Sequence, residues 1–466
     1  MRALFVGIAF MCCALSIQAQ LPYTEAKYTY NSTLNLTYGN AIDYAGNTVA
    51  LTMDLYKPNN DFCNRPIMIL VHGGAWVAGT KNDVDLVAMS KFFAQRGYVV
   101  ANINYRLGNH KTNNFTKYAF CSESLASPCA YVADSAEVIR ANYRGMQDLK
   151  GVIRYMKLRH GMDSSDHNNV FLAGESAGGF ICLSAAFVND GSEVHASCNN
   201  IADAVVADPD MANYNCLATP LNRTRPDLGN LEGTIYSSSN YDSRVQGVGN
   251  FFGGSFDLSQ IDSTEAMNTA LYLYHQGSDV VVHYNKGPLL GRISWECFAQ
   301  TNLCQSFSYY PWANGSKAIH QHISKWPVDS RFYKADIIEN YQYMQDCTDN
   351  GHSIDNGNIN TRVQTMANVF AEKIKANGNS PKSDCQLSIQ NIQIQMHLSP
   401  NPNQGQFTLS GPYDLQGQTF EIHNNLGQMV YSGKVEEGNS FRLKGLNNGC
   451  YALHIGNYNY NFIINY

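Results

Sequence analysis

Apolar residues along this chain gather in short runs with few or no polar interruptions. The runs lie at 67–71, 98–103, 170–173, 204–207 and 271–274. Runs of this length are typical of β-strands that are covered on both faces. An earlier segment, 49–55, instead alternates apolar and polar residues, which predicts a strand with one buried face.

Between the runs, apolar residues recur every three or four positions. This spacing places Ile139, Met146 and Ile153 on one face of a helix over 139–156, and it returns over 363–374. Strands that alternate with helices predict an α/β fold in which a mainly parallel sheet has helices on both faces. A functional site in such a fold is expected at the carboxyl ends of the strands.

The composition changes after residue 376. Residues 377–396 are polar and rich in residues that break helices and strands, which indicates a linker. From 397 to 466, short strand-like segments alternate with turns, and this spacing predicts a small β-sandwich. We therefore expect a large domain over 20–376, followed by the linker and a second domain over 397–466.

The first 19 residues have the layout of a secretory signal peptide. One arginine precedes a short apolar run, and small residues follow near Ala19. This order predicts cleavage after Ala19. Because the apolar run is too short to predict a membrane span, we expect no transmembrane segment in the mature chain.

Charge and composition exclude several classes of partner. The 466-residue chain has 44% hydrophobic and 15% charged residues, a balance typical of globular proteins. Its net charge is -6 and it has no basic run, so nucleic acid and anionic membranes are not expected as partners. The sequence has no paired C-x-x-C pattern and no H-E-x-x-H motif, so no metal ion is expected.

The cysteines predict disulfides and one unpaired thiol. Of the 13 cysteines, two lie in the signal peptide, which leaves an odd number in the exported chain. Cys121 with Cys129 and Cys297 with Cys304 are close enough in sequence to predict disulfide bonds. Cys182 is expected to be a buried free thiol.

A G-x-S-x-G motif follows the run at 170–173. Gly174, Ser176 and Gly178 occupy its fixed positions, and apolar and small residues typical of a helix follow over 180–187. On a strand–turn–helix bend of this kind, the serine hydroxyl stands exposed above the sheet as a nucleophile. Ser176 is therefore the predicted nucleophile.

The segment HGGAW at 72–76 follows the run at 67–71. Folds of this type place backbone N–H donors at this strand end, where they face the nucleophile and stabilise an oxyanion. Gly73 and Gly74 let their amides point inward without side chains in the way. The amide of Ala177, directly after the serine, is the second predicted donor.

Four segments together resemble the α/β-hydrolase carboxylesterases, in particular the bacterial esterase and feruloyl-esterase-like group. They are HGGAWVAGTK, NYRL, GESAGG and HQGSDVVVHY, and the resemblance spans about 47–376. It implies an α/β-hydrolase catalytic domain that needs no cofactor. It also implies a catalytic acid just after the strand at 271–274, which corresponds to Asp279. Asp208, after the run at 204–207, is the alternative acid.

Three histidines follow Asp279 as candidates for the catalytic base. His320 and His322 lie in 315–325, which reads as a helix, whereas His352 lies in the polar turn 349–357. A triad histidine must stand on a loop from which it reaches both the serine and the acid. We therefore predict His352, with His320 and His322 as alternatives.

The C-terminal segment resembles the sorting domain of the type IX secretion system of Bacteroidetes. The matching residues are Pro400, Asn401, Pro402, Gly405, Phe407, Leu426, Gly427, Val430, Tyr431, Leu446, Gly449 and Tyr451. This resemblance implies that the type IX machinery exports the enzyme, which then stands secreted or on the cell surface of a Gram-negative bacterium. A carbohydrate-binding or adhesive module is the alternative for the same pattern.

These features predict a secreted serine carboxylesterase that works through an acyl-enzyme, with feruloyl or acetyl esters of plant polysaccharides as substrates. A lipase, a polyester hydrolase, a peptidase of the same fold and a non-catalytic surface binding protein are the alternatives. Two long stretches, 108–132 and 208–266, interrupt the core pattern, and stretches of this length usually have a function. Their aromatic residues are expected either to line an acyl site or to pack the loops onto the sheet; they are Phe115, Tyr118, Phe120, Tyr236, Tyr241, Phe251 and Phe252.

Overall fold

A computed structural model describes most of the chain. The described residues are 21–110, 134–202, 224–290, 310–339, 351–354, 359–383, 397–410, 415–455 and 458–466. The predicted signal peptide and both predicted disulfide pairs lie outside these residues, as do Asp208 and the predicted strand at 204–207. Within them, Cys182 is buried and free, as predicted, and Cys63 is disulfide-bonded.

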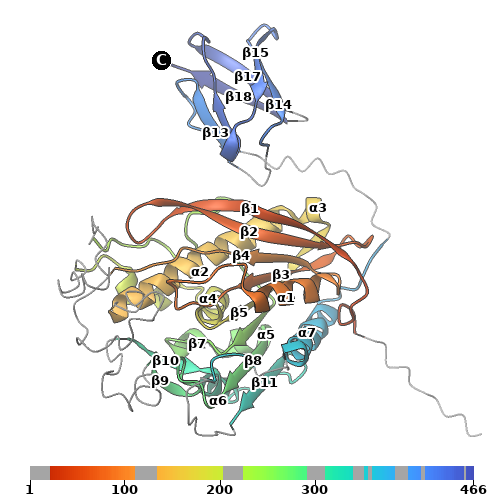
Figure 1. The fold of residues 1–466 in the computed structure, drawn as a ribbon, viewed down its shortest axis with the longest axis vertical. Helices are drawn as coiled ribbons and strands as arrows, with labels where there is room; N and C mark the ends of the chain where they lie inside the picture. The colour runs from red at the N-terminus through yellow and green to blue at the C-terminus, as the bar shows by residue number, and fades with distance from the viewer. Residues whose placement is uncertain are drawn as a thin grey trace, which may run out of the picture.

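The larger part of the molecule is built on one eight-stranded sheet (Figure 1). In spatial order its strands are β1 (Tyr30–Ile42), β2 (Thr48–Pro58), β4 (Val99–Ile103), β3 (Arg65–Val71), β5 (Ser165–Glu175), β6 (Gly247–Phe251), β8 (Ala270–Gln276) and β11 (Tyr333–Ile338). β1 pairs antiparallel with β2, and β2 pairs antiparallel with β4, while every later pair in this order is parallel. The predicted mainly parallel sheet is confirmed.

Helices cover both faces of this sheet (Figure 1). They are α1 (Val84–Ala94), α2 (Ser135–Leu158), α3 (His160–Asp163), α4 (Ala177–Phe187), α5 (Ser263–Asn268), α6 (Ser316–Ile323) and α7 (Ile359–Ala376). Successive residues of β3 point to opposite faces, because side chains alternate along a strand. Ile69 belongs to the hydrophobic cluster that includes Met146 of α2. Leu70 belongs to the other cluster, with Phe93 of α1 and Phe370 of α7.

Strands β1 and β6 are absent from the sequence prediction. The structure places β6 inside the stretch 208–266, which we expected to interrupt the core. Its sequence, GVGNF, contains two glycines and lacks an apolar run. The fold requires Gly249, since a side chain there would strike the sulfur of Met366 in α7. Close packing against a helix has thus removed the hydrophobic signal by which strands are recognised.

Smaller elements complete this part of the molecule. Strands β7 (Gly254–Ser255), β10 (Trp312–Gly315) and β9 (Lys286–Pro288) form a three-stranded sheet in that order. Short 3₁₀ turns lie at Gly191–Glu193, Ala196–Cys198 and Leu258–Gln260.

The C-terminal segment folds into two antiparallel sheets. One contains β12 (His397–Ser399), β13 (Gln406–Ser410) and β16 (Ser440–Arg442). The other contains β15 (Met429–Lys434), β14 (Thr419–His423), β17 (Gly449–Ile455) and β18 (Tyr458–Ile464), and a 3₁₀ turn lies at Glu437–Asn439. Both sheets contribute to one hydrophobic cluster, in which Phe407 and Phe441 stack with ring centroids 4.8 Å apart. This is the predicted small β-sandwich.

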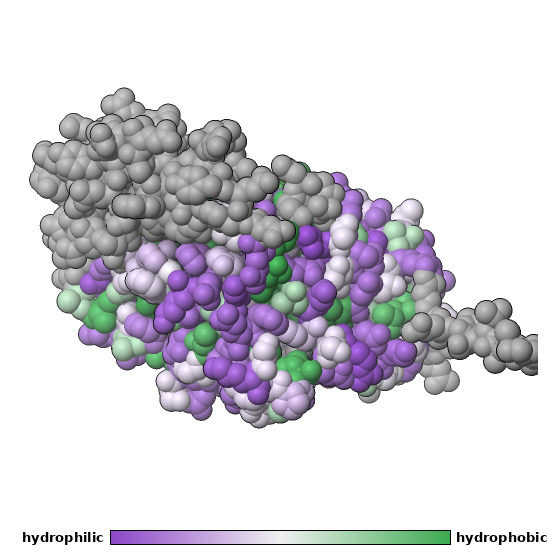
Figure 2. Space-filling view, turned by 90° about the horizontal axis from the view of Figure 1, so that it is seen from below, coloured by the Kyte–Doolittle hydropathy of each residue, from purple (hydrophilic) through white to green (hydrophobic). Residues whose placement is uncertain are grey.

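On the face shown in Figure 2, hydrophobic residues stand in small groups among hydrophilic ones. None of the helices within the described residues is both long and apolar enough to cross a membrane.

Candidate active site

Ser176 stands on the bend between β5 and α4. Its backbone adopts φ 51° and ψ −122°, a conformation that non-glycine residues rarely hold. A side chain at Gly174 would strike the backbone of Gly178, and one at Gly178 would strike the carbonyl of Val71. The two glycines of the motif are therefore required by close backbone contacts. The serine N–H donates to the carbonyl of Phe251 at the end of β6 (2.9 Å), and this bond holds the bend against the sheet.

Asp279 lies in the turn after β8 and is fully buried. Its Oδ1 accepts hydrogen bonds from the backbone N–H groups of Val281 (2.8 Å) and Val282 (2.9 Å). Its Oδ2 lies 2.8 Å from Nδ1 of His352 and 3.1 Å from Nε2 of His275. Burial by itself would raise the pKa of Asp279, but the two histidines lower it below its ordinary value. The carboxylate is therefore ionised at neutral pH.

His352 connects the acid to the serine. Its Nε2 lies 2.8 Å from Oγ of Ser176, and its Nδ1 faces Asp279. The preceding Gly351 packs against the turn of the acid, where a side chain would lie 2.6 Å from the backbone nitrogen of Asp279. The ring of Phe252 meets the imidazole edge-to-face, with centroids 4.8 Å apart. The structure thus brings together the three residues that the sequence proposed for the triad.

The alternative histidines are bound elsewhere. His320 and His322 lie in α6, as their helical pattern predicted. Nδ1 of His320 lies 2.7 Å from the hydroxyl of Tyr333, and Nε2 of His322 lies 2.9 Å from the carbonyl of Ile261. Neither ring contacts Ser176 or Asp279 in the described part of the chain.

His275 is a site residue that the sequence argument missed. It is fully buried at the end of β8, and the backbone N–H of Ser316 lies 3.3 Å from its Nδ1. Since that N–H can only donate, Nδ1 is the acceptor and Nε2 carries the proton. The Nε2–H then donates to Asp279 and to the carbonyl of Val282 (2.9 Å). Its position four residues before the acid, inside HQGSD, was the available signal.

The 72–76 loop lies directly beside the serine. A side chain at Gly73 would come within 3.1 Å of Cβ of Ser176. Gly74, Ala75 and Trp76 all have positive φ (107°, 50° and 62°), so the loop has a tightly curled backbone. Ala177 is the first residue of α4, and the first N–H groups of a helix lack intrahelical acceptors. The three predicted oxyanion donors thus lie in segments that border Ser176.

A buried histidine and tyrosine support this loop. The rings of His72 and Tyr105 stack with centroids 4.4 Å apart, and the tyrosine hydroxyl donates to the carbonyl of His72 (3.2 Å). Nδ1 of His72 lies 2.6 Å from the carbonyl of Gly73. Burial lowers the pKa of His72, so the ring is neutral at pH 7 and acts as a packing element.

Glu175 immediately precedes the serine and is 7% exposed. Its Oε1 is buried and has no hydrogen-bond partner among the described residues. Burial raises the pKa of Glu175 well above its ordinary value, and the nearby Asp83 and Asp85 add to the rise. Burial and these carboxylates therefore favour the neutral acid at Glu175, the residue that precedes Ser176.

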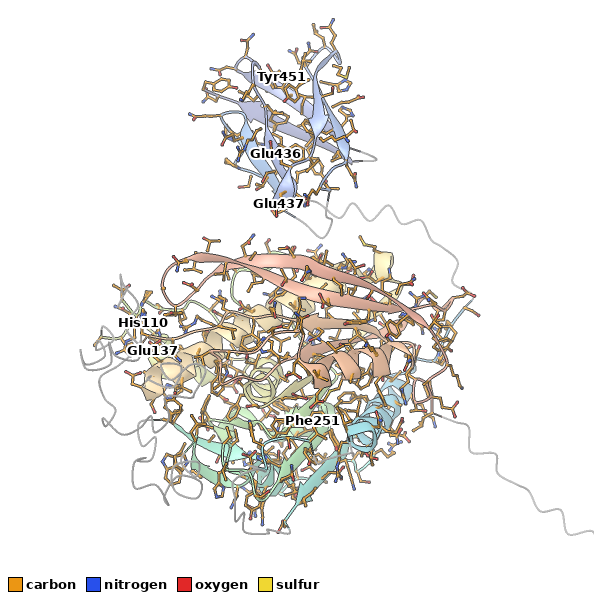
Figure 3. The ribbon with its side chains drawn as sticks, viewed as in Figure 1. His110, Glu137, Phe251, Glu436, Glu437 and Tyr451 are labelled. Carbon is orange, nitrogen blue, oxygen red and sulfur yellow. The ribbon has the colours of Figure 1, made fainter. Side chains whose placement is uncertain are left out.

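Few of the aromatic residues considered for an acyl site lie near the triad. Tyr236 stacks on Tyr155 of α2, and Tyr241 contacts His160 and His167. Phe251, labelled in Figure 3, is buried at the end of β6, and its side chain belongs to the hydrophobic core. Phe252 contacts His352 as described above, whereas Phe115, Tyr118 and Phe120 lie outside the described residues.

A second aromatic group borders the 72–76 loop. Trp76 packs against Phe180 of α4 with ring centroids 5.4 Å apart, and Phe180 packs against Phe256 at 5.0 Å. Phe256 is only partly buried, so this group exposes aromatic surface beside the 72–76 loop. The sequence analysis did not select these residues.

No group of three or more acidic, histidine or cysteine side chains within the described ranges is arranged to hold a metal ion.

Comparisons with known proteins agree with both resemblances. A family model described as BD-FAE matches residues 53–137, which include the 72–76 loop and end before Ser176. A model described as the secretion system C-terminal sorting domain matches residues 397–465. The resemblance to esterases and that to a sorting domain, both predicted from motifs, are confirmed. The sorting domain points to type IX secretion and to a secreted or cell-surface location.

Several solved structures are similar to this chain. The apo form of Thermogutta terrifontis esterase 2 is 13% identical, with a TM-score of 0.35, and the match covers 79% of this chain and 100% of that chain. A truncated carbohydrate esterase from gut microbiota is 15% identical, with a TM-score of 0.37, and the match covers 75% of this chain and 98% of that chain. No curated protein matches the chain.

Proposed function

We propose that this esterase-like chain is a secreted serine carboxylic ester hydrolase that works through an acyl-enzyme. Ser176 is the nucleophile, His352 the general base and Asp279 the acid that orients it. One observation carries the proposal: a continuous pair of 2.8 Å contacts runs from Oγ of Ser176 through His352 to Oδ2 of Asp279. With its proton on Nδ1, His352 presents an unprotonated Nε2 that accepts the serine proton.

The reaction follows from these positions. As Oγ of Ser176 bonds to the ester carbonyl carbon, its proton passes to Nε2 of His352. The carbonyl oxygen becomes an oxyanion, and its collapse breaks the bond to the alkoxy group, which leaves with the proton from His352. Water then gives a proton to His352 and attacks the acyl carbon, and the second tetrahedral intermediate collapses as His352 returns that proton to Oγ of Ser176, which departs as the hydroxyl. Asp279 stays ionised throughout and stabilises the imidazolium.

The amides of Gly73, Gly74 and Ala177 are the proposed oxyanion donors. Support comes from the closeness of the loop at Gly73, where an added side chain would come within 3.1 Å of Cβ of Ser176, and from the place of Ala177 at the start of α4. A donor of this kind lowers the barrier by about 2.7–4 kcal/mol in comparable sites.

We propose feruloyl or acetyl esters of plant polysaccharides as substrates. Support for an aromatic or small acyl group comes from the rings at the site, because Phe252 lies at His352 and Phe256 stands partly exposed beside the 72–76 loop. We also propose that residues 20–376 form the catalytic domain and that 377–396 link it to the sorting domain at 397–466.

The test is hydrolysis of a panel of p-nitrophenyl acetate, butyrate and octanoate together with methyl ferulate. We expect turnover by the mature protein, and a loss of kcat of about 10³-fold or more in Ser176→Ala and in His352→Ala. The matched control is His320→Ala, which also removes an imidazole and should keep kcat/KM within about twofold.

Each contrary result is informative. Loss of activity in His320→Ala with retention in His352→Ala would overturn the assigned base. A marked preference for octanoate would indicate a lipase. If the folded wild-type protein hydrolyses none of the esters, the enzymatic proposal fails.

A further inference from the structure

A cavity of about 340 Å³ lies beside the first turns of α2. Arg106, Arg140 and Arg144 line it, together with Tyr44 and His110. Figure 3 labels His110, which lies next to Glu137 of α2. The volume is in the range of small-molecule sites, and the described lining shares no residue with the site around Ser176.

Two of the three arginines already form ion pairs with carboxylates of the protein. Nε of Arg106 donates to Asp148 at 2.8 Å, and the two form an ion pair. Arg140 donates to the carbonyl of Ser197 (2.8 Å), and its Nε lies 3.7 Å from Oε1 of Glu137. Their charges are therefore compensated within the fold.

Arg144 differs from both. It is 3% exposed, and its Nη2 donates to the carbonyl of Gly108 (2.9 Å). No carboxylate of the described chain forms an ion pair with it. Burial lowers the pKa of Arg144 to about 10, which leaves it charged at pH 7. The carboxylates of Glu137 and Asp148 act on Arg144 electrostatically without forming an ion pair with it. An anion that enters the cavity can therefore form the close ion pair that this guanidinium lacks.

Tyr44 adds a second donor. Its ring packs on the backbone at Gly108, the residue that Arg144 contacts, and meets His110 edge-to-face at 5.3 Å. Arg144 is also close enough to act electrostatically on the tyrosine hydroxyl. That hydroxyl has no hydrogen-bond partner within the ranges that the structure describes. It can therefore donate to a ligand that pairs with Arg144.

We propose that this cavity binds a small monocarboxylate, which pairs with Arg144 and accepts a hydrogen bond from Tyr44. The guanidinium fork matches the geometry of a carboxylate. Asp43 and Asp227 also line the cavity and would repel an anion with two charges. The volume admits a molecule of the size of a monosaccharide acid, so D-glucuronate is a suitable probe.

The experiment is a calorimetric titration of the full chain with D-glucuronate, sulfate and D-glucose at constant ionic strength. We expect saturable binding of glucuronate in the millimolar range, as one desolvated charge pair would give. Glucose has nearly the same shape but no charge and should not bind, and sulfate should bind at least about tenfold more weakly than glucuronate.

Two variants test the assigned donors, and neither readout depends on ester hydrolysis. Arg144→Gln should weaken glucuronate binding at least about tenfold, and Tyr44→Phe should weaken it about three- to tenfold. The matched control is Arg244→Gln, which removes an arginine whose side chain is 88% exposed and should leave binding unchanged. Melting curves without ligand establish that each variant is folded.

The proposal is overturned by any of three results. They are equal binding of glucuronate and glucose, equal binding of glucuronate by wild type and both folded variants, and sulfate binding as tight as that of glucuronate. Failure of the ester assay would leave this test unaffected, since the titration measures only the cavity.

Discussion

Glu175 and Asp279 are two buried carboxyl groups near Ser176, one preceding it in the chain and the other connected to it through His352, and they differ in their partners. Asp279 accepts hydrogen bonds from two backbone amides and faces two histidines. Glu175 has a buried oxygen without a partner in the described residues. The pKa of Asp279 is lowered, whereas that of Glu175 is raised well above its ordinary value.

The difference shows that burial alone does not decide ionisation. Both groups lose contact with water, which favours the neutral acid. At Asp279, donors and nearby imidazoles outweigh this loss, so the carboxylate stays charged beside His352. At Glu175, the nearest charges are further carboxylates, so the proton stays. Of these two carboxyl groups, burial and the nearby carboxylates favour the neutral acid at Glu175, whereas the histidines favour the anion at Asp279.

Asp279→Asn removes the charge of Asp279 and should have the largest effect among substitutions of Asp279, Glu175 and His275. The asparagine NH2 can donate to Nδ1 of His352, which moves the imidazole proton to Nε2 and gives the wrong tautomer. We expect kcat for the preferred ester to fall about 10⁴-fold. Steady-state kinetics measure the loss, and Asp329→Asn, at an exposed salt bridge, is the matched control. A loss of less than about tenfold would show that Asp279 does not orient the base.

Glu175→Gln tests the raised pKa of Glu175 through the pH dependence of the free energy of unfolding. The folded chain keeps the proton of Glu175, while the unfolded chain releases it above the ordinary value of 4.5. Wild-type stability therefore falls as pH rises from 4.5 towards the raised folded pKa, by at most about 1.4 kcal/mol per pH unit. Glutamine does not titrate, so the variant should gain stability relative to wild type over this range.

Urea unfolding at pH 5, 6 and 7 measures this gain. A difference in the free energy of unfolding that stays constant across the three pH values would mean that Glu175 is ionised in the fold.

His275 is expected to have the smallest of these effects. His275→Leu removes the Nε2–H donor to Asp279, and we expect kcat/KM to fall about tenfold, as for one lost hydrogen bond to a charge. The carboxylate would then interact more strongly with His352, so the acid limb of the pH profile should move to higher pH.

His275→Gln is the matched variant, because its amide nitrogen can donate from nearly the same position. It should recover most of the activity and the pH profile. Equal losses in both variants without movement of the acid limb would indicate a packing role only.

Much of the sheet could be predicted because buried strands and helices leave strong local patterns. Strands β3, β5 and β8 coincide with apolar runs, and α2 and α7 with a helical period. β6 could not be predicted, since the glycine at 249 packs against Met366, which lies far away in sequence. The positions of the aromatic side chains could not be predicted either. Nothing local in the sequence shows that Tyr236 stacks on Tyr155 rather than near Ser176.

At the site, the sequence alone was enough to predict the features that depend on residues adjacent in the chain. The order Gly174, Ser176, Gly178 specifies a tight bend, and the turn around His352 specifies a loop rather than a helix. Tertiary structure alone decided that Asp279 and His352 meet, 73 residues apart, at 2.8 Å. It also decided that His275 joins them and that Glu175 stays neutral. The physical reason is that hydrogen bonding and desolvation depend on which groups the fold brings together. Those groups lie far apart in the sequence, so local patterns do not identify them.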